Sequence, residues 1–214
     1  MKKTALVAAV CAASLAALTL AGCGNTATSS STETKSEATA EVTTDDSAAA
    51  PGDEAGFQEI SIFEDEELGG FIHMNAVYFQ PVTMTGGYDD ISDVNLHLEA
   101  DISALENDLG FGTGDWIPYL TVSYKVEDES GATVAEGTFM PMSASDGPHY
   151  GQNIYLEKAG TYQLTISVSP QEDVYLIHTD SETGPGNGGH SFDDYFKDGA
   201  LSVTKEWKYT PVEY

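Results

Sequence analysis

The stretch VNLHLEADI, residues 94–102, alternates strictly between apolar and polar side chains. Successive side chains of a β-strand point to opposite faces, so this two-residue period predicts a half-buried strand. Its apolar face would pack in a core, and its polar face would carry Asn95, His97, Glu99 and Asp101. An imidazole and a carboxylate two residues apart would therefore project together from one side of the strand.

Similar patterns continue along the chain as far as residue 210. Further strands are predicted at residues 71–84, 116–126, 132–142, 152–157, 161–170, 174–178 and 201–210. Turn sequences such as Glu129-Ser130-Gly131 and Asp146-Gly147-Pro148 separate these segments. No long amphipathic helix is evident. Many short strands at this spacing predict an all-β domain, a β-sandwich, over residues 57–214.

The first 22 residues have the features of a lipoprotein signal peptide. A basic pair, Lys2-Lys3, precedes a short apolar run, and Leu20-Ala21-Gly22-Cys23 resembles a lipobox. The run is too short for a membrane-spanning helix. Cleavage before Cys23 would leave that residue at the N-terminus for lipidation, whereas the alternative is an ordinary signal peptide with a chance cysteine. We therefore expect an exported protein, anchored by lipid to the cell membrane on the cell surface or periplasmic side.

Residues 23–56 are predicted to be a disordered tether that begins at the lipidated cysteine. They consist mostly of Ser, Thr, Ala, Glu and Asp, with almost no large apolar residue. Such a segment cannot bury enough surface to offset the entropy lost on ordering. It would hold the domain at a distance from the membrane.

The acidic composition excludes several classes of function. The chain has 35 acidic residues against eight lysines and no arginine, for a formal charge of −27. Once Lys2 and Lys3 leave with the signal, the charge falls to about −29. This argues against nucleic acid or phosphate as a partner. The charge is typical of a protein kept soluble at a cell surface, or of one that raises the local concentration of cations.

Cysteine usage narrows the chemistry further. Cys11 lies in the signal and Cys23 would carry lipid, so the folded part has no thiol. Disulfides, cysteine-zinc sites, thiol nucleophiles and blue-copper centres are excluded. The G-x-S-x-G, P-loop and H-E-x-x-H motifs are also absent from the sequence.

The residues most suited to chemistry are histidines at strand faces and ends, with thioether and carboxylate groups nearby. His97 and Glu99 share a strand face, and the turn before His149 could bring it back toward Met142. His178 ends the predicted strand 174–178. Such a set suits copper, and Glu99 would make it more tolerant of iron or manganese. The alternatives are a solvated outer face for His97 and Glu99, and a core position for the methionine.

Four longer segments carry a resemblance to a known family. They are DVNLHLEADISALEND, GTGDWIPYLTVSYKV, GTFMPMSASDGPHYGQNI and HTDSETG, in this order. From about Ala76 to Tyr209 the chain resembles the periplasmic high-affinity iron-transport protein family, whose members are copper-binding accessory proteins found beside an iron permease and include lipoproteins. The resemblance implies an immunoglobulin-like β-sandwich, usually a homodimer, that serves iron uptake.

The resemblance also implies a set of metal ligands. The copper ligands of the family fall on His97, Glu99, Met142, His149 and His178. Glu99 corresponds to a variable ligand, able to join or leave the sphere or to help hold iron nearby.

The chain departs from the family pattern in two places. His73 and Met74 stand where the family commonly has an acidic or amide residue, so they could alter a second metal position. Residues 185–200 are inserted before the last strands and bring His190. For His73 and His190 the alternative is an ordinary surface residue.

These observations predict a lipid-anchored component of an iron-uptake system that binds copper and iron ions and works with a membrane iron permease. We expect a binding protein rather than an enzyme. The alternatives are a copper chaperone or copper-tolerance protein, and a structural or adhesive sandwich lipoprotein without metal.

Overall fold

The computed structural model describes residues 58–213. The predicted signal peptide, the lipidation site Cys23 and the tether fall on residues 1–57, outside the described residues. Within residues 58–213, no helix has the length and apolar character needed to cross a membrane.

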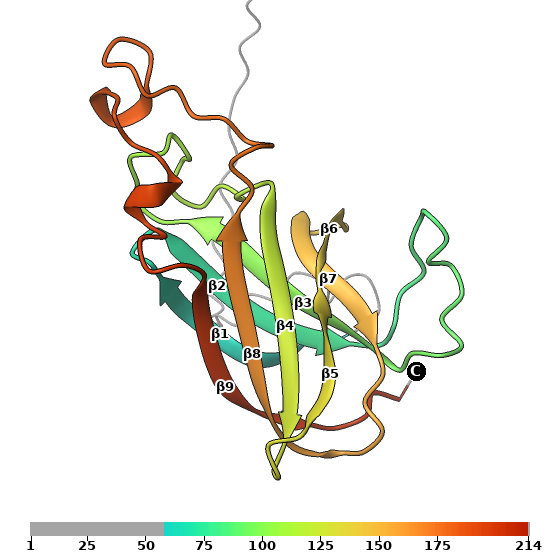
Figure 1. Ribbon diagram of the computed structural model, residues 1–214. Helices are drawn as coiled ribbons and strands as arrows, with labels where there is room; N and C mark the ends of the chain where they lie inside the picture. The colour runs from blue at the N-terminus through green and yellow to red at the C-terminus, as the bar shows by residue number, and fades with distance from the viewer. Residues whose placement is uncertain (1–57, 214) are drawn as a thin grey trace, which may run out of the picture. The chain divides into compact units, whose positions relative to one another are not determined.

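The described residues form two antiparallel sheets. The strands are β1 Ile60–Leu68, β2 Ile72–Phe79, β3 Leu96–Ala104, β4 Leu120–Asp128, β5 Thr133–Thr138, β6 Met140–Ser143, β7 Pro148–Ile154, β8 Gly160–Pro170 and β9 Leu201–Tyr209. One sheet has the order β1-β2-β3-β7-β6, and the other has the order β5-β4-β8-β9. In Figure 1 the four-stranded sheet lies in front of the five-stranded sheet. The predicted β-sandwich is confirmed.

The core lies between the two sheets and follows the two-residue period of the strands. On β3 the buried apolar residues Leu96, Leu98 and Ala100 face inward, and on β8 Leu164 and Ile166 do the same. Each of these five side chains is fully buried. Because alternate side chains point to opposite faces, His97 and Glu99 belong to the outer face of the five-stranded sheet.

The predicted strand 132–142 is two strands in different sheets. Residues Thr133–Thr138 pair with β4, whereas Met140–Ser143 pair with β7. The chain changes sheet at Phe139, whose buried ring stacks on Tyr124 with centroids 4.9 Å apart. The second half, β6, is an edge strand. An edge position accommodates Pro141, which cannot donate to a ladder.

Two other expectations differ from the structure. Residues 174–178 are not a strand, because the backbone amides of Val174 and Tyr175 turn back to the carbonyl of Gln171, each at 3.0 Å. His178 therefore lies in a loop rather than at a strand end. In contrast, β1 was not predicted, and its acidic sequence ISIFEDEEL carries a bulged register against β2.

The inserted segment 185–200 packs on one end of the sandwich. It contains the short 3₁₀ turns η2 Pro185–Asn187 and η3 Phe192–Asp194. Figure 1 shows the orange-to-red segment between β8 and β9 at this end. Phe192 is buried, and the ring centroid of Tyr195 lies 4.4 Å from that of Phe71. Aromatic packing thus ties the insertion to the core.

We expect Phe192→Ala to lower the free energy of unfolding by about 3–5 kcal/mol, because a buried ring would be lost and a cavity left behind. Asp193→Ala, in the same turn but exposed, should change the free energy by less than about 0.5 kcal/mol. Urea unfolding followed by tryptophan fluorescence would measure both. Equal effects of the two substitutions would contradict a packing role for the insertion.

Candidate metal centre

The candidate site lies on the outer face of the five-stranded sheet, where three neighbouring strands meet. In the ladder between β3 and β7, His97 is opposite Asn153 and Glu99 is opposite Gly151. In the ladder between β6 and β7, Met142 is opposite His149. The turn after β6 therefore returns His149 to Met142, as the sequence predicted.

This outer face is buried at the site, which argues against the alternative of a solvated polar face for His97 and Glu99. The exposed fractions of His97, Glu99 and His149 are 1%, 2% and 4%. The loop after β2 contributes to the burial, since Asn153 Nδ2 donates to the carbonyl of Val82 at 2.7 Å and Asn153 Oδ1 accepts from the Val82 amide at 3.2 Å. The half-buried strand predicted from residues 94–102 is therefore buried on both faces at its centre.

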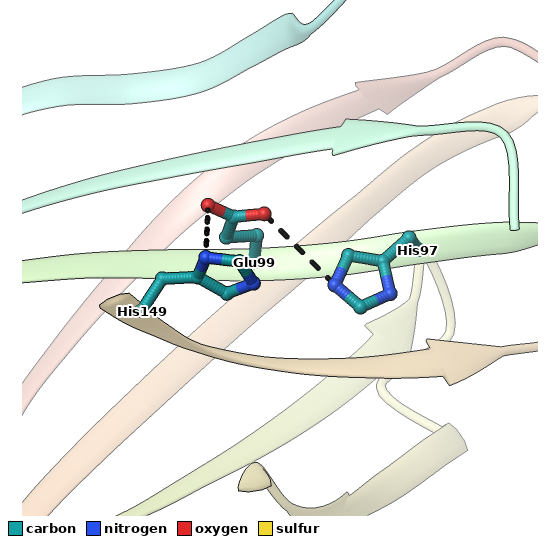
Figure 2. Close-up of side chains that lie close together, drawn as sticks. All are labelled: His97, Glu99 and His149. Atoms are coloured by element: carbon teal, nitrogen blue, oxygen red, sulfur yellow. Dashed lines mark ion pairs between the residues drawn. The ribbon is translucent and has the colours of Figure 1, made fainter. Parts of the chain in front are cut away.

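Three side chains form a compact group of metal-binding type. One ligand atom from each of His97, Glu99 and His149 lies within 4.8 Å of the others, and no second group of this kind occurs within residues 58–213. Figure 2 shows the Glu99 carboxyl group between the two imidazole rings. Its Oε1 lies 3.3 Å from His149 Nδ1, and its Oε2 lies 3.9 Å from His97 Nε2.

Hydrogen bonds fix which nitrogen of His97 is available. The two bonds to Val82 orient the Asn153 amide, so the atom 2.9 Å from His97 Nδ1 is an oxygen. An amide oxygen only accepts, and Nδ1 must therefore carry the proton. His97 Nε2 is then a lone-pair atom that is buried without a hydrogen-bond partner. A buried nitrogen lone pair without a hydrogen-bond partner is suited to binding a metal ion.

Burial keeps the group uncharged. Desolvation lowers the pKa of His97 to about 4 and also lowers the pKa of His149. Desolvation, with the charge and hydrogen bond of Asp101, raises the pKa of Glu99 to about 9. At neutral pH the close contacts of Glu99 with the two histidines are therefore contacts between neutral groups. Neutral imidazoles are the form that binds metal.

A cavity of about 590 Å³ opens beside the histidines. Its lining includes His97, His149 and Met142, together with residues of the loop after β2. Met142 is half-buried, whereas Met140, two residues earlier, is 39% exposed and absent from this lining. Of the two methionines, Met142 is thus the one that lines the cavity with the imidazoles and lies opposite His149 in the ladder.

The remaining predicted ligands lie elsewhere. His178 is exposed in the loop after β8, and its Nδ1 lies 2.9 Å from Thr183 Oγ1. His73 Nε2 is 3.1 Å from Asp65 Oδ1, and His190 Nδ1 is 3.3 Å from Asp194 Oδ2.

Met74 is fully buried in the core. It lies on the face of β2 opposite to His73. No group of three or more His, Cys, Asp or Glu ligands within the described residues includes His73, His178 or His190.

Two contributors to the site were not predicted from the sequence. Asn153 orients His97, and Gly151 leaves room for its ring, since a Cβ at this position would lie 2.5 Å from His97 Nε2. The signal for Gly151 is a glycine inside a strand, which often marks close approach of another group. The role of Asn153 depends on its contact with the distant Val82.

Residues 56–210 match the model of a family described as Fe2+ transport protein. The chain belongs to this family. The 34 kDa membrane antigen of Treponema pallidum is 42% identical to this chain over 137 residues. The match covers 61% of the chain and 67% of the antigen.

Solved structures of two relatives resemble the chain. FetP of uropathogenic E. coli is 41% identical with a TM-score of 0.64, covering 74% of this chain and 100% of FetP. Copper-reconstituted P19 of Campylobacter jejuni is 39% identical with a TM-score of 0.63, covering 73% of this chain and 99% of P19. A FetP variant has also been solved with copper bound.

We expect Glu99→Gln to change how the stability of the metal-free protein depends on pH. Because folding raises the pKa of Glu99 from 4.5 to about 9, the wild type loses stability as pH rises through this window. The uncharged glutamine removes this loss. Because one pKa unit corresponds to about 1.4 kcal/mol, the free energy of unfolding of the variant relative to the wild type should increase by more than about 1 kcal/mol from acidic to alkaline pH. Thermal unfolding between acidic and alkaline pH would measure the difference. Parallel curves for the two proteins would contradict the burial of a neutral Glu99, and exposed Glu157→Gln serves as the control.

Gly151→Ala should disturb the site through the backbone. The added Cβ would lie 2.5 Å from His97 Nε2, so the ring must move, at a cost of about 1–3 kcal/mol. Gly160→Ala is the matched control, because the nearest atom to its Cβ would be 3.8 Å away. Urea unfolding and the ring NMR signals of His97 would report both effects. An unmoved His97 signal in Gly151→Ala would contradict the close approach.

Proposed function

We propose that this chain is an extracytoplasmic, lipid-anchored protein of a high-affinity iron-uptake system, which holds copper and hands iron to a membrane permease. The observation that carries the proposal is the buried group of His97, Glu99 and His149, in which His97 Nε2 is unpartnered. Membership of the Fe2+ transport family and the copper found in the solved relatives support it.

The donor atoms fit copper. Neutral imidazoles suit copper in both oxidation states, and the thioether of Met142 is a soft donor that favours Cu(I). His97, Met142 and His149 would hold the ion, and Glu99 would join the sphere by losing its proton. Copper held by such donors can change between Cu(I) and Cu(II), which is the chemistry it would supply during iron handover.

We assign the fourth permanent ligand to His178 of a second copy of the chain in a homodimer. In one chain His178 is exposed and stands apart from the buried group. The exposed loop that carries it is free of the sheet ladders, which leaves its ring accessible to a partner. The family resemblance implies both the ligand role and the homodimer.

Iron would be the cargo rather than a fixed cofactor. The formal charge of −27 for the whole chain would raise the concentration of cations near its surface. A lipid at Cys23 and the following segment would keep the domain near the membrane that contains the permease. The proposed copper site does not use His73 and His190, which pair with Asp65 and Asp194, or Met74, which is buried in the core.

Copper titration tests the site. In the mature chain with Cys23→Ser, His149→Ala should lower copper affinity on the order of 100-fold or more, because loss of a ligand exceeds the roughly 10–100-fold cost of losing a group that only orients one. His190→Ala, a histidine outside the buried group, should leave the affinity unchanged. Competition with a chelator of known affinity would measure both. Equal copper binding by the wild type and His149→Ala would refute the assigned site.

Growth tests the physiological role. A strain that lacks the protein should grow poorly under iron limitation, and the wild-type chain but not His149→Ala should restore growth. A defect confined to copper stress would instead support a copper chaperone or copper-tolerance protein. A strain with neither defect would favour a structural or adhesive role.

A further inference from the structure

The loop that begins at His178 is organised around the carboxylate of Asp180. Asp180 Oδ1 accepts from the backbone amides of Glu182 at 3.0 Å and Thr183 at 2.9 Å. The hydroxyl of Thr183 donates to Asp180 Oδ2 at 2.5 Å. Both carboxyl oxygens of Asp180 therefore act as acceptors, and the proton of the Thr183 hydroxyl points to Asp180.

This arrangement determines the hydrogen bond made by His178. Thr183 Oγ1 lies 2.9 Å from His178 Nδ1. A hydroxyl has one proton, and Thr183 gives it to Asp180, so toward His178 the oxygen can only accept. Nδ1 must then carry a proton, and Nε2 of the neutral ring keeps its lone pair.

The loop backbone is closely packed around these side chains. The amide of Gly184 donates to the carbonyl of Asp180 at 2.9 Å, and the amide of Gly189 donates to the carbonyl of Thr179 at 2.7 Å. A Cβ at Gly184 would lie 2.5 Å from the carbonyl oxygen of His178. The inserted segment, which begins at residue 185, thus closes directly on the loop that holds His178.

We propose that Asp180 and Thr183 are positioning residues that hold His178 in the Nδ1–H tautomer, so that Nε2 is the atom presented to copper. The inference rests on the proposed function for the identity of the metal. Without these hydrogen bonds an exposed imidazole could rotate and exchange tautomers. Copper binding would then cost the free energy of fixing both the ring orientation and the tautomer. Asn153 does the same for His97 through a different group, so both histidines offer Nε2.

The tautomer can be measured directly in the metal-free protein. In the mature chain with Cys23→Ser, the ¹⁵N shifts of the imidazole should identify protonated Nδ1 in wild-type His178. Thr183→Val keeps the side-chain shape but removes the acceptor, and should shift the ring toward the Nε2–H tautomer. Thr183→Ser should restore the wild-type pattern. Exposed Thr179→Val, beside His178, is the matched control.

The same variants should change copper affinity. We expect Thr183→Val to lower it by about 10–100-fold, as for other groups that orient metal-binding histidines, and Thr183→Ser to recover most of the loss. A change in the number of nitrogens coupled to Cu(II) in electron paramagnetic resonance spectra would separate loss of His178 from general weakening.

Two results would overturn the inference. One is an Nε2–H tautomer in wild-type His178, and the other is a Thr183→Val variant with unchanged tautomer and unchanged copper affinity. The proposed function fails in a different way, through equal copper binding by the wild type and His149→Ala. The metal-free tautomer decides the inference in either case.

Discussion

The antiparallel pairing of β3 with β7 is the contact on which the site depends. It sets His97 beside Asn153 and Glu99 beside Gly151, and the next ladder sets Met142 beside His149. A shift of this register by one residue would turn the inner face of β3 outward and bury the imidazole and carboxylate in the core. The apolar packing between the two sheets therefore specifies the site as strongly as it specifies the fold.

Burial determines the chemistry of this face. Each polar group is placed where its charged form is disfavoured, so the metal-free site is neutral and Glu99 retains a proton. A cation would reverse this preference, because it stabilises the carboxylate and compensates for desolvation. Glu99 can thus respond to the charge of the ion, whereas His97 is held by Asn153 in a single tautomer.

The sequence predicts the parts of this arrangement that are local. Alternation in residues 94–102 predicts the strand and the side chains that share a face, and the turn before His149 predicts its return to Met142. Burial of that face depends on the loop after β2 and on Asn153, which are distant contacts that no local pattern contains. Residues 174–178 alternate as a strand does, with Tyr175 packed against the core, but their backbone bonds form a turn. Tertiary context overrides propensity there.

The change of sheet at Phe139 would affect how long the proposed site holds an ion. β6 is a short edge strand, and such strands open easily when they are held only by their own ladder. Here the ring of Phe139 is buried against Tyr124 of the opposite sheet. The backbone amide of Phe139 also donates a hydrogen bond to the carbonyl of Val122 at 2.8 Å. Withdrawal of the Met142 thioether by opening of β6 would therefore pull on the core. If Met142 holds the ion as proposed, the lifetime of the bound state would be coupled in this way to the cooperative stability of the whole domain.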